Sequence, residues 1–79
     1  MDEEEVRKIF HERIKRLIDD TVKLLNKSMR AQACEMGIAQ STLYSYYTGQ
    51  VMPRIDIAAV MAWYYGVSAD YLVGMNDLI

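Results

Sequence analysis

The chain has 79 residues, of which 52% are hydrophobic and 25% are charged, and its net charge at pH 7 is −2. A chain of this length supports one hydrophobic core, so we expect a single domain over residues 1–79. The composition excludes disordered and collagen-like chains, and no apolar run reaches the ~18 residues of a membrane span, so no membrane partner is expected. The acidic start, MDEEEVRK, is unlike a secretory signal and predicts a cytoplasmic location.

Metal and catalytic sites are not expected. The one cysteine, Cys34, cannot form a disulfide within the chain, and together with the one histidine, His11, it falls short of the three or four ligands of a zinc site. The sequence shows no histidine beside a nucleophile, no paired carboxylates in a plausible pocket and no phosphate-binding loop. It therefore predicts no enzyme, no metal and no cofactor, and His11, among charged residues, is expected to face solvent.

Apolar residues recur at helical spacing from about Glu3 to Leu25, and charges fill the other face of this first helix. Ser28 offers an N-cap oxygen for a second helix that reaches Met36, where Gly37 can take the positive φ that ends a helix. The expected apolar stripe of the first helix runs through Val6, Phe10, Ile14, Leu17, Thr21 and Leu24.

Three further helices are expected downstream, and strand signals are nearly absent because no period-two alternation is sustained. The third helix covers about residues 40–47 and stops at Gly49, and the fourth covers residues 55–65 and is closed by Gly66. Ser68 caps a last short helix through Val73. The sequence therefore predicts an all-α chain of five helices.

An ordered set of residues between Ser28 and Gly74 carries a family resemblance. The set contains Ala33, Gly37, Ile38, Ser41, Leu43, Tyr46, the pair Gly49 and Pro53 in GQVMP, and the ending GVSADYLVG. It resembles the Cro and phage-repressor type of helix-turn-helix proteins, also called the xenobiotic-response-element type. The resemblance implies a compact five-helix, lambda-repressor-like DNA-binding domain with an extended first helix, and a helix-turn-helix at about residues 28–48.

The residues of this segment also have physical reasons of their own. Ala33 is small where the second and third helices approach most closely, and Gly37 supplies the turn between them. If Leu43 and Tyr46 face inward, the outward face of the third helix is polar and uncharged. That face consists of Gln40, Ser41, Tyr44 and Ser45.

The resemblance implies that the third helix lies in the major groove of double-stranded DNA, with its outward residues on base edges. Glutamine can pair bidentately with adenine, and serine can bond several bases. The predicted base contacts are Gln40, Ser41, Tyr44 and Ser45, and the predicted backbone contacts are Lys27, Arg30, Thr42 and Arg54. The alternative is an ordinary solvated polar face with solvated cations around it.

Four positions depart from the family pattern. Met29 stands where the family usually has a phosphate-binding glutamine, and Gln32 where it has an apolar residue. Ala39 replaces the usual Ser or Thr cap of the third helix, a loss of ~1 kcal/mol, and Tyr47 takes a place often held by glutamate.

The fourth helix is apolar on nearly all sides, so it must be covered either by the long first helix or by a partner. Its expected core stripe is Ile55, Ala58, Met61, Ala62 and Tyr65. Its second apolar face is Ile57, Val60, Trp63 and Tyr64, which we predict to be a homodimer interface, because two half-sites one DNA turn apart require a two-fold pair.

The leading functional hypothesis is a sequence-specific, dimeric transcriptional repressor that occupies an inverted repeat. The alternative is a protein-interaction module on the same scaffold, such as an antitoxin or a regulator's partner, with little DNA binding. Met29, Ala39, the tyrosines and the acidic pI of about 5.2 favour the alternative.

Overall fold

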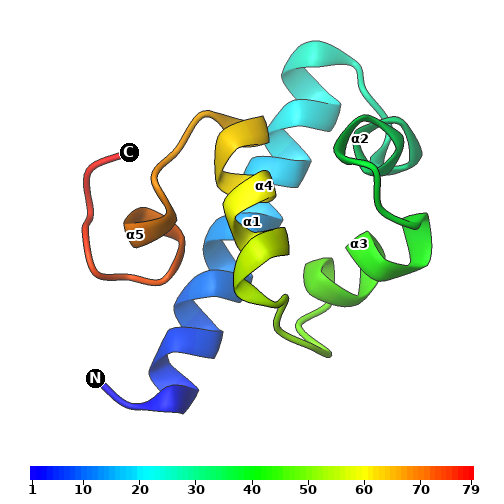
Figure 1. The fold of residues 1–79 in the computed structure, drawn as a ribbon. Coiled ribbons are helices and arrows are strands. Elements are labelled where there is room, and N and C mark those ends of the chain that lie inside the picture. Colours follow the sequence, from blue (N-terminus) through cyan, green and yellow to red (C-terminus); the bar gives the residue numbers. More distant parts are fainter.

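The structure is a computed structural model that describes all 79 residues, and it contains five helices and no strand. The helices are α1 (Glu3–Leu25), α2 (Met29–Met36), α3 (Gln40–Tyr47), α4 (Ile55–Tyr65) and α5 (Ala69–Leu72) (Figure 1). The all-α class and the expected helix bounds are confirmed, the last helix ending one residue before the predicted Val73. No helix of the chain is both long enough and apolar enough to span a membrane.

Short-range hydrogen bonds set most helix ends. The side chains of Asp2, Ser28 and Ser68 accept bonds from the backbone N–H three residues later, which satisfies one free donor at the start of α1, α2 and α5. At the other end, α1 stops where Asn26 takes the left-handed conformation, with φ of 54°. The same conformation at Gly37 (φ 75°) ends α2, where the absence of a Cβ removes its steric cost.

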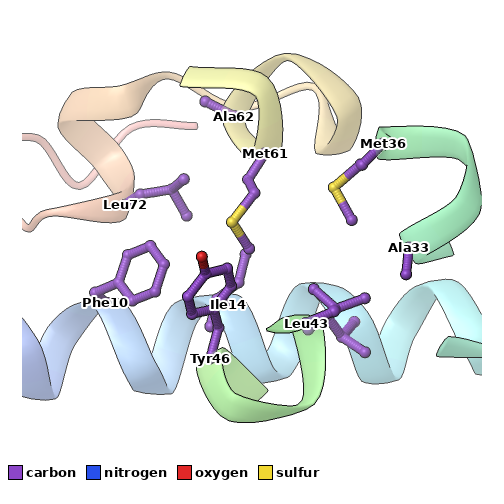
Figure 2. Close-up of a cluster of buried hydrophobic side chains, with 10 residues drawn as sticks. Phe10, Ile14, Ala33, Met36, Leu43, Tyr46, Met61, Ala62 and Leu72 are labelled. Carbon is purple, nitrogen blue, oxygen red and sulfur yellow. The ribbon is translucent and has the colours of Figure 1, made fainter. Parts of the chain in front are cut away.

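One apolar core takes residues from all five helices. Figure 2 shows Met61 reaching from α4 toward Ile14 of α1 and Tyr46 of α3. Ala33 is buried between the helices, as its small size predicted. The full core is Phe10, Ile14, Ile18, Ala33, Met36, Leu43, Tyr46, Met61, Ala62 and Leu72.

The predicted burial of two residues of the apolar stripes is wrong. Leu24, on the last turn of α1, is 75% exposed, and Ile55, the first residue of α4, is 88% exposed. The prediction that His11 faces solvent is also wrong. Its ring is half-buried beneath Gly49, and its Nε2 lies 3.0 Å from the carbonyl oxygen of Tyr47.

Gln32, at a position where the resemblance predicts an apolar residue, is fully buried in the interior. Its amide nitrogen donates to the carbonyl oxygens of Lys27 at 3.0 Å and Ile18 at 3.4 Å, and its Oε1 accepts from the Tyr65 hydroxyl at 2.6 Å. Because each polar atom has a partner, the burial of this amide does not leave the large cost of an unpaired group.

Both chain termini lie on the left side of the view in Figure 1, apart from each other and away from α2 and α3 on the right. Arg13 fastens the C-terminal tail to α1 through its guanidinium group, which donates to the carbonyl oxygens of Tyr71 and Asn76 and to the carboxylate of Asp77. The acidic N-terminal residues are therefore separated from the α2–α3 pair.

Candidate nucleic-acid interface

The α2–α3 pair is joined by a three-residue turn, Gly37–Ala39. The turn is closed by a backbone bond of 3.0 Å from the Ile38 N–H to the Ala33 carbonyl and by a second bond from the Gly37 N–H. Ile38 is partly buried and packs against the core. This combination of a left-handed glycine, a bond back across the turn and an apolar anchor fixes the direction in which α3 leaves α2.

The first turn of α3 presents uncharged polar side chains to solvent. Gln40 and Ser41 are exposed, and neither side chain has a hydrogen-bond partner within the protein. Ser45 was also predicted to lie on the outward face. It is instead half-buried, and its Oγ donates to the Thr42 carbonyl at 2.6 Å. Thr42 is also half-buried. The structure therefore leaves Gln40 and Ser41 unengaged but occupies the donor of Ser45.

Tyr44 is the largest exposed side chain on α3, and a chain of contacts holds it in place. Its ring stacks on Tyr47, with 6.4 Å between centroids. The Tyr47 hydroxyl donates to Asp19 of α1 at 2.7 Å, and Lys15 donates to the same carboxylate at 3.2 Å. The bond from Tyr47 lowers the pKa of Asp19 below its ordinary value and raises the pKa of Tyr47 itself. Tyr47 thus ties α3 to α1.

The predicted backbone contacts differ in whether their charge is free. Arg30, on the first turn of α2, is exposed and has no ion pair within the chain. Lys27 pairs with Glu35 at 2.9 Å, and Arg54 pairs with Asp56 at 3.2 Å. Arg30 is therefore the one member of the predicted cationic set whose charge is not already balanced by a neighbouring acid.

Glu35 has a second partner besides Lys27, because the Tyr64 hydroxyl of α4 donates to the same carboxylate oxygen. This bond, and then that of Lys27, lower the pKa of Glu35. Burial together with the bond to Glu35 raises the pKa of Tyr64 to about 12. Lys27, Glu35 and Tyr64 thus form one cluster that joins the start of α2 to the end of α4.

The second apolar face of α4 divides into two parts. Ile57 and Tyr64 are partly buried and pack against the core, so the chain itself covers much of them. Val60 and Trp63 are exposed, Trp63 to 79%. Two of the four residues predicted at a dimer interface are thus without cover from their own chain.

Sequence reasoning missed the residues that brace the α2–α3 pair: Asp19 and Lys15 behind Tyr47, Glu35 beside Lys27, and Tyr65 on Gln32. The hydrogen-bonded pairs Tyr47–Asp19 and Tyr65–Gln32 lie 28 and 33 residues apart in sequence. No local pattern marks such pairs, although the unusual Tyr47 and Gln32 were signals that pointed to one member of each.

No family model, no curated protein and no solved structure matches this chain in the comparisons made. No group of three or more His, Cys, Asp and Glu side chains lies close enough together to hold a metal ion.

Proposed function

We propose that the protein is a sequence-specific DNA-binding regulator that reads the major groove with the first turn of α3. The observation that carries this proposal is the pair of unengaged polar side chains, Gln40 and Ser41, on the exposed first turn of a helix whose Leu43 and Tyr46 pack into the core. A glutamine amide and a serine hydroxyl are groups that read base edges in the major groove. In this proposal the arrangement of the five helices is that of the lambda-repressor-like domains that the sequence resembles.

The surroundings of α3 suit a DNA duplex in two respects. No acidic residue lies on α3, and Glu35, the one acid on α2, is already bonded to Lys27 and Tyr64. Arg30 offers an unpaired charge to a phosphate. Phosphate contacts position such a helix, and base contacts provide its sequence preference.

The experiment is a selection from a pool of random DNA duplexes with the purified protein, at low and at physiological salt, followed by sequencing of the retained DNA. Enrichment of a defined half-site, repeated in inverted orientation, is expected for a dimeric repressor. A pool that stays random at both salt concentrations contradicts the proposal.

Two matched variants locate the base-reading group. Gln40→Ala is expected to relax the preference at one base pair by ~1–3 kcal/mol, since a bidentate pair is lost. Gln50→Ala removes the same side chain beyond the far end of α3, where it is exposed. It is expected to leave the base preference unchanged, so equal effects of the two variants would argue against reading by Gln40.

Two observations favour the second candidate, a protein-interaction module on the same scaffold. Two of the three predicted cationic contacts, Lys27 and Arg54, are paired with acids of their own chain, while Trp63 is an uncovered apolar side chain. An apolar interface weakens little with salt, whereas binding to phosphates weakens steeply. Retention of a protein partner at high salt, with no DNA selected, is the result expected for this candidate.

A further inference from the structure

Three residues of α1 converge on a single residue of α3, Tyr47. They are His11, Lys15 and Asp19, which are spaced by four residues and therefore share one face of α1. The Nε2 atom of His11 lies 3.0 Å from the carbonyl oxygen of Tyr47, and the Nζ atom of Lys15 lies 5.1 Å from the centroid of its ring. Asp19 accepts a bond of 2.7 Å from its hydroxyl. The backbone, the ring and the hydroxyl of Tyr47 are thus each contacted by a different turn of α1.

Tyr47 in turn supports the exposed ring of Tyr44. The two rings are stacked, with 6.4 Å between centroids and 20° between planes, which is within the range of aromatic pairs. Tyr44 is 53% exposed, and an exposed side chain without such support changes rotamer freely. Because the Tyr47 ring is itself fixed by α1, the stack restricts the direction in which the Tyr44 ring leaves α3.

The position of Tyr44 limits what its ring can contact on a DNA duplex. It lies on the same outward face as Gln40, one helical turn further along α3. In an intact duplex, stacking covers the faces of the bases, so a side chain in the major groove meets only their edges. The apolar group on those edges is the C5-methyl group of thymine, which aromatic side chains contact. A fixed aromatic ring beside Gln40 therefore suits a thymine.

We propose that Tyr44 reads a thymine methyl group, and that Tyr47 and Asp19 are positioning residues that fix the Tyr44 ring for this contact without touching the DNA. This inference rests on the proposed function and adds one feature of the preferred DNA, a thymine close to the base pair that Gln40 reads. A side chain that is already ordered loses less conformational freedom on binding. The restriction of Tyr44 by Tyr47 therefore increases the affinity for the methyl group.

The bonds of Asp19 agree with a positioning role. An unpaired carboxylate next to α3 would repel a phosphate, but Lys15 donates to the second oxygen of Asp19 at 3.2 Å. Both carboxylate oxygens are therefore bonded, one to Lys15 and one to Tyr47. Asp20, the next residue of α1, is also exposed but forms no ion pair within the chain, so it provides a matched control.

The test uses the duplex enriched in the DNA selection, with each thymine replaced in turn by deoxyuridine. This replacement removes one methyl group and leaves the charge and the base pairing unchanged. For the wild type, replacement of one thymine close to the base pair read by Gln40 is expected to weaken binding about fourfold, as for one methyl group withdrawn from an apolar contact. Tyr44→Ala is expected to bind the two duplexes equally. Fluorescence anisotropy measures both affinities.

The positioning role is tested by the ratio of these two affinities. Asp19→Ala is expected to reduce the ratio from about fourfold to about twofold or less. Asp19→Asn keeps an oxygen that accepts from the Tyr47 hydroxyl and is expected to retain more of the ratio than Asp19→Ala. The control Asp20→Ala is expected to leave the ratio at its wild-type value. Because both duplexes carry the same charge, the loss of an acid changes the two affinities alike and cancels in the ratio.

A purely structural role of Asp19 has a different signature, since it would weaken binding to both duplexes and leave the ratio unchanged. The side chain of Asp19 is 47% exposed, so these variants are expected to fold, which circular dichroism checks.

Four results would overturn the inference. They are a duplex in which no thymine methyl group affects binding, a methyl preference that Tyr44→Ala leaves intact, a ratio that Asp19→Ala does not change, and equal losses of the ratio in Asp19→Asn and Asp19→Ala. In each of these cases the protein has selected a duplex, so the DNA proposal stands. A protein that selects no duplex contradicts both proposals.

Discussion

The free-energy cost of burying the Gln32 amide is offset by its hydrogen bonds. Gln32→Leu leaves the Tyr65 hydroxyl and two backbone carbonyls without their bonds, so we expect a loss of about 1 to 3 kcal/mol in the free energy of unfolding. Tyr65→Phe in the same chain removes the orphaned hydroxyl, and the double variant is expected to recover part of the loss. Urea unfolding of the two single variants and the double variant measures the coupling. Strictly additive losses would show that the two side chains act independently.

Tyr64 predicts a dependence of stability on alkaline pH. Its pKa in the folded chain is about 12, above the ordinary value of 10.0, so folding favours the neutral hydroxyl. A group whose pKa is raised contributes stability that is complete below its unfolded pKa and is lost as pH rises through the folded pKa. The contribution of Tyr64 is therefore expected to be constant below pH 10 and to disappear between pH 10 and 12.

The measurement is the free energy of unfolding of the wild type and of Tyr64→Phe across this pH range. The difference between the two proteins isolates Tyr64 from Tyr65, whose pKa burial also raises. A difference that does not change with pH would contradict the assignment of the shift to Tyr64.

At the scale of the helix, α3 lacks a side-chain cap. Ala39 holds the N-cap position in extended conformation, with φ of −68° and ψ of 146°, and makes no side-chain bond. Ala39→Ser supplies an oxygen for a free N–H of the first turn and is expected to raise the free energy of unfolding by about 1 kcal/mol. The control Ala59→Ser makes the same change at an exposed position inside α4 and is expected to give no gain. Equal effects of the two substitutions in urea unfolding would rule out capping as the cause.

Local signals were sufficient for the helices but not for the contacts between them. Ser28, Gly37 and Gly66 set helix ends by bonds within a few residues, so the sequence predicted those ends. Core residues such as Phe10 and Ile14 followed from the helical period. The exposure of Ile55 could not, because the period of a helix does not tell where the neighbouring helices stop covering it.

Some features of the candidate site also followed from the local sequence, and others depend on contacts between distant residues. The outward position of Gln40 and Ser41 followed from helix geometry. The ion pair between Lys27 and Glu35 did not, because the Glu35 carboxylate is held between Lys27 and Tyr64 of α4, which lies far away in sequence. The half-burial of His11 likewise depends on a bond to Tyr47, 36 residues away. Which polar groups are free is therefore a property of the tertiary structure.

Over the whole molecule, charge is distributed so that a net charge of −2 does not prevent contact with an anion. Four of the eleven acids are residues 2–5, and the N-terminus lies at the end of the molecule opposite to α2 and α3 (Figure 1), whereas Asp19 accepts a hydrogen bond from Tyr47 of α3. The cations around the α2–α3 pair are Lys15, whose Nζ lies 5.1 Å from the centroid of the Tyr47 ring, and Lys27, Arg30 and Arg54, which lie next to α2 or follow α3 in the chain. The field that a ligand meets at the α2–α3 pair is thus set by these few groups and their pairing, and less by the net charge of the chain.

For the proposed DNA binding, this distribution predicts a shallow salt dependence. Each neutralised phosphate contributes about −0.9 to the slope of log K against log salt concentration. With Arg30 free and with Lys27 and Arg54 paired, one copy on a half-site is expected to show a slope between about −1 and about −3. Arg30→Ala is expected to reduce the magnitude of the slope by about 1.

Arg7→Ala is the control for this last prediction, because it removes the same charge near the N-terminus, where Arg7 pairs with Glu3. Fluorescence anisotropy with a labelled half-site, titrated at several salt concentrations, gives the slope for each protein. If both substitutions reduce it equally, the chain responds only through its net charge. If Arg30→Ala alone reduces it, the phosphate contact is local, and the pairing of Lys27 with Glu35 accounts for the shallow slope of the wild type.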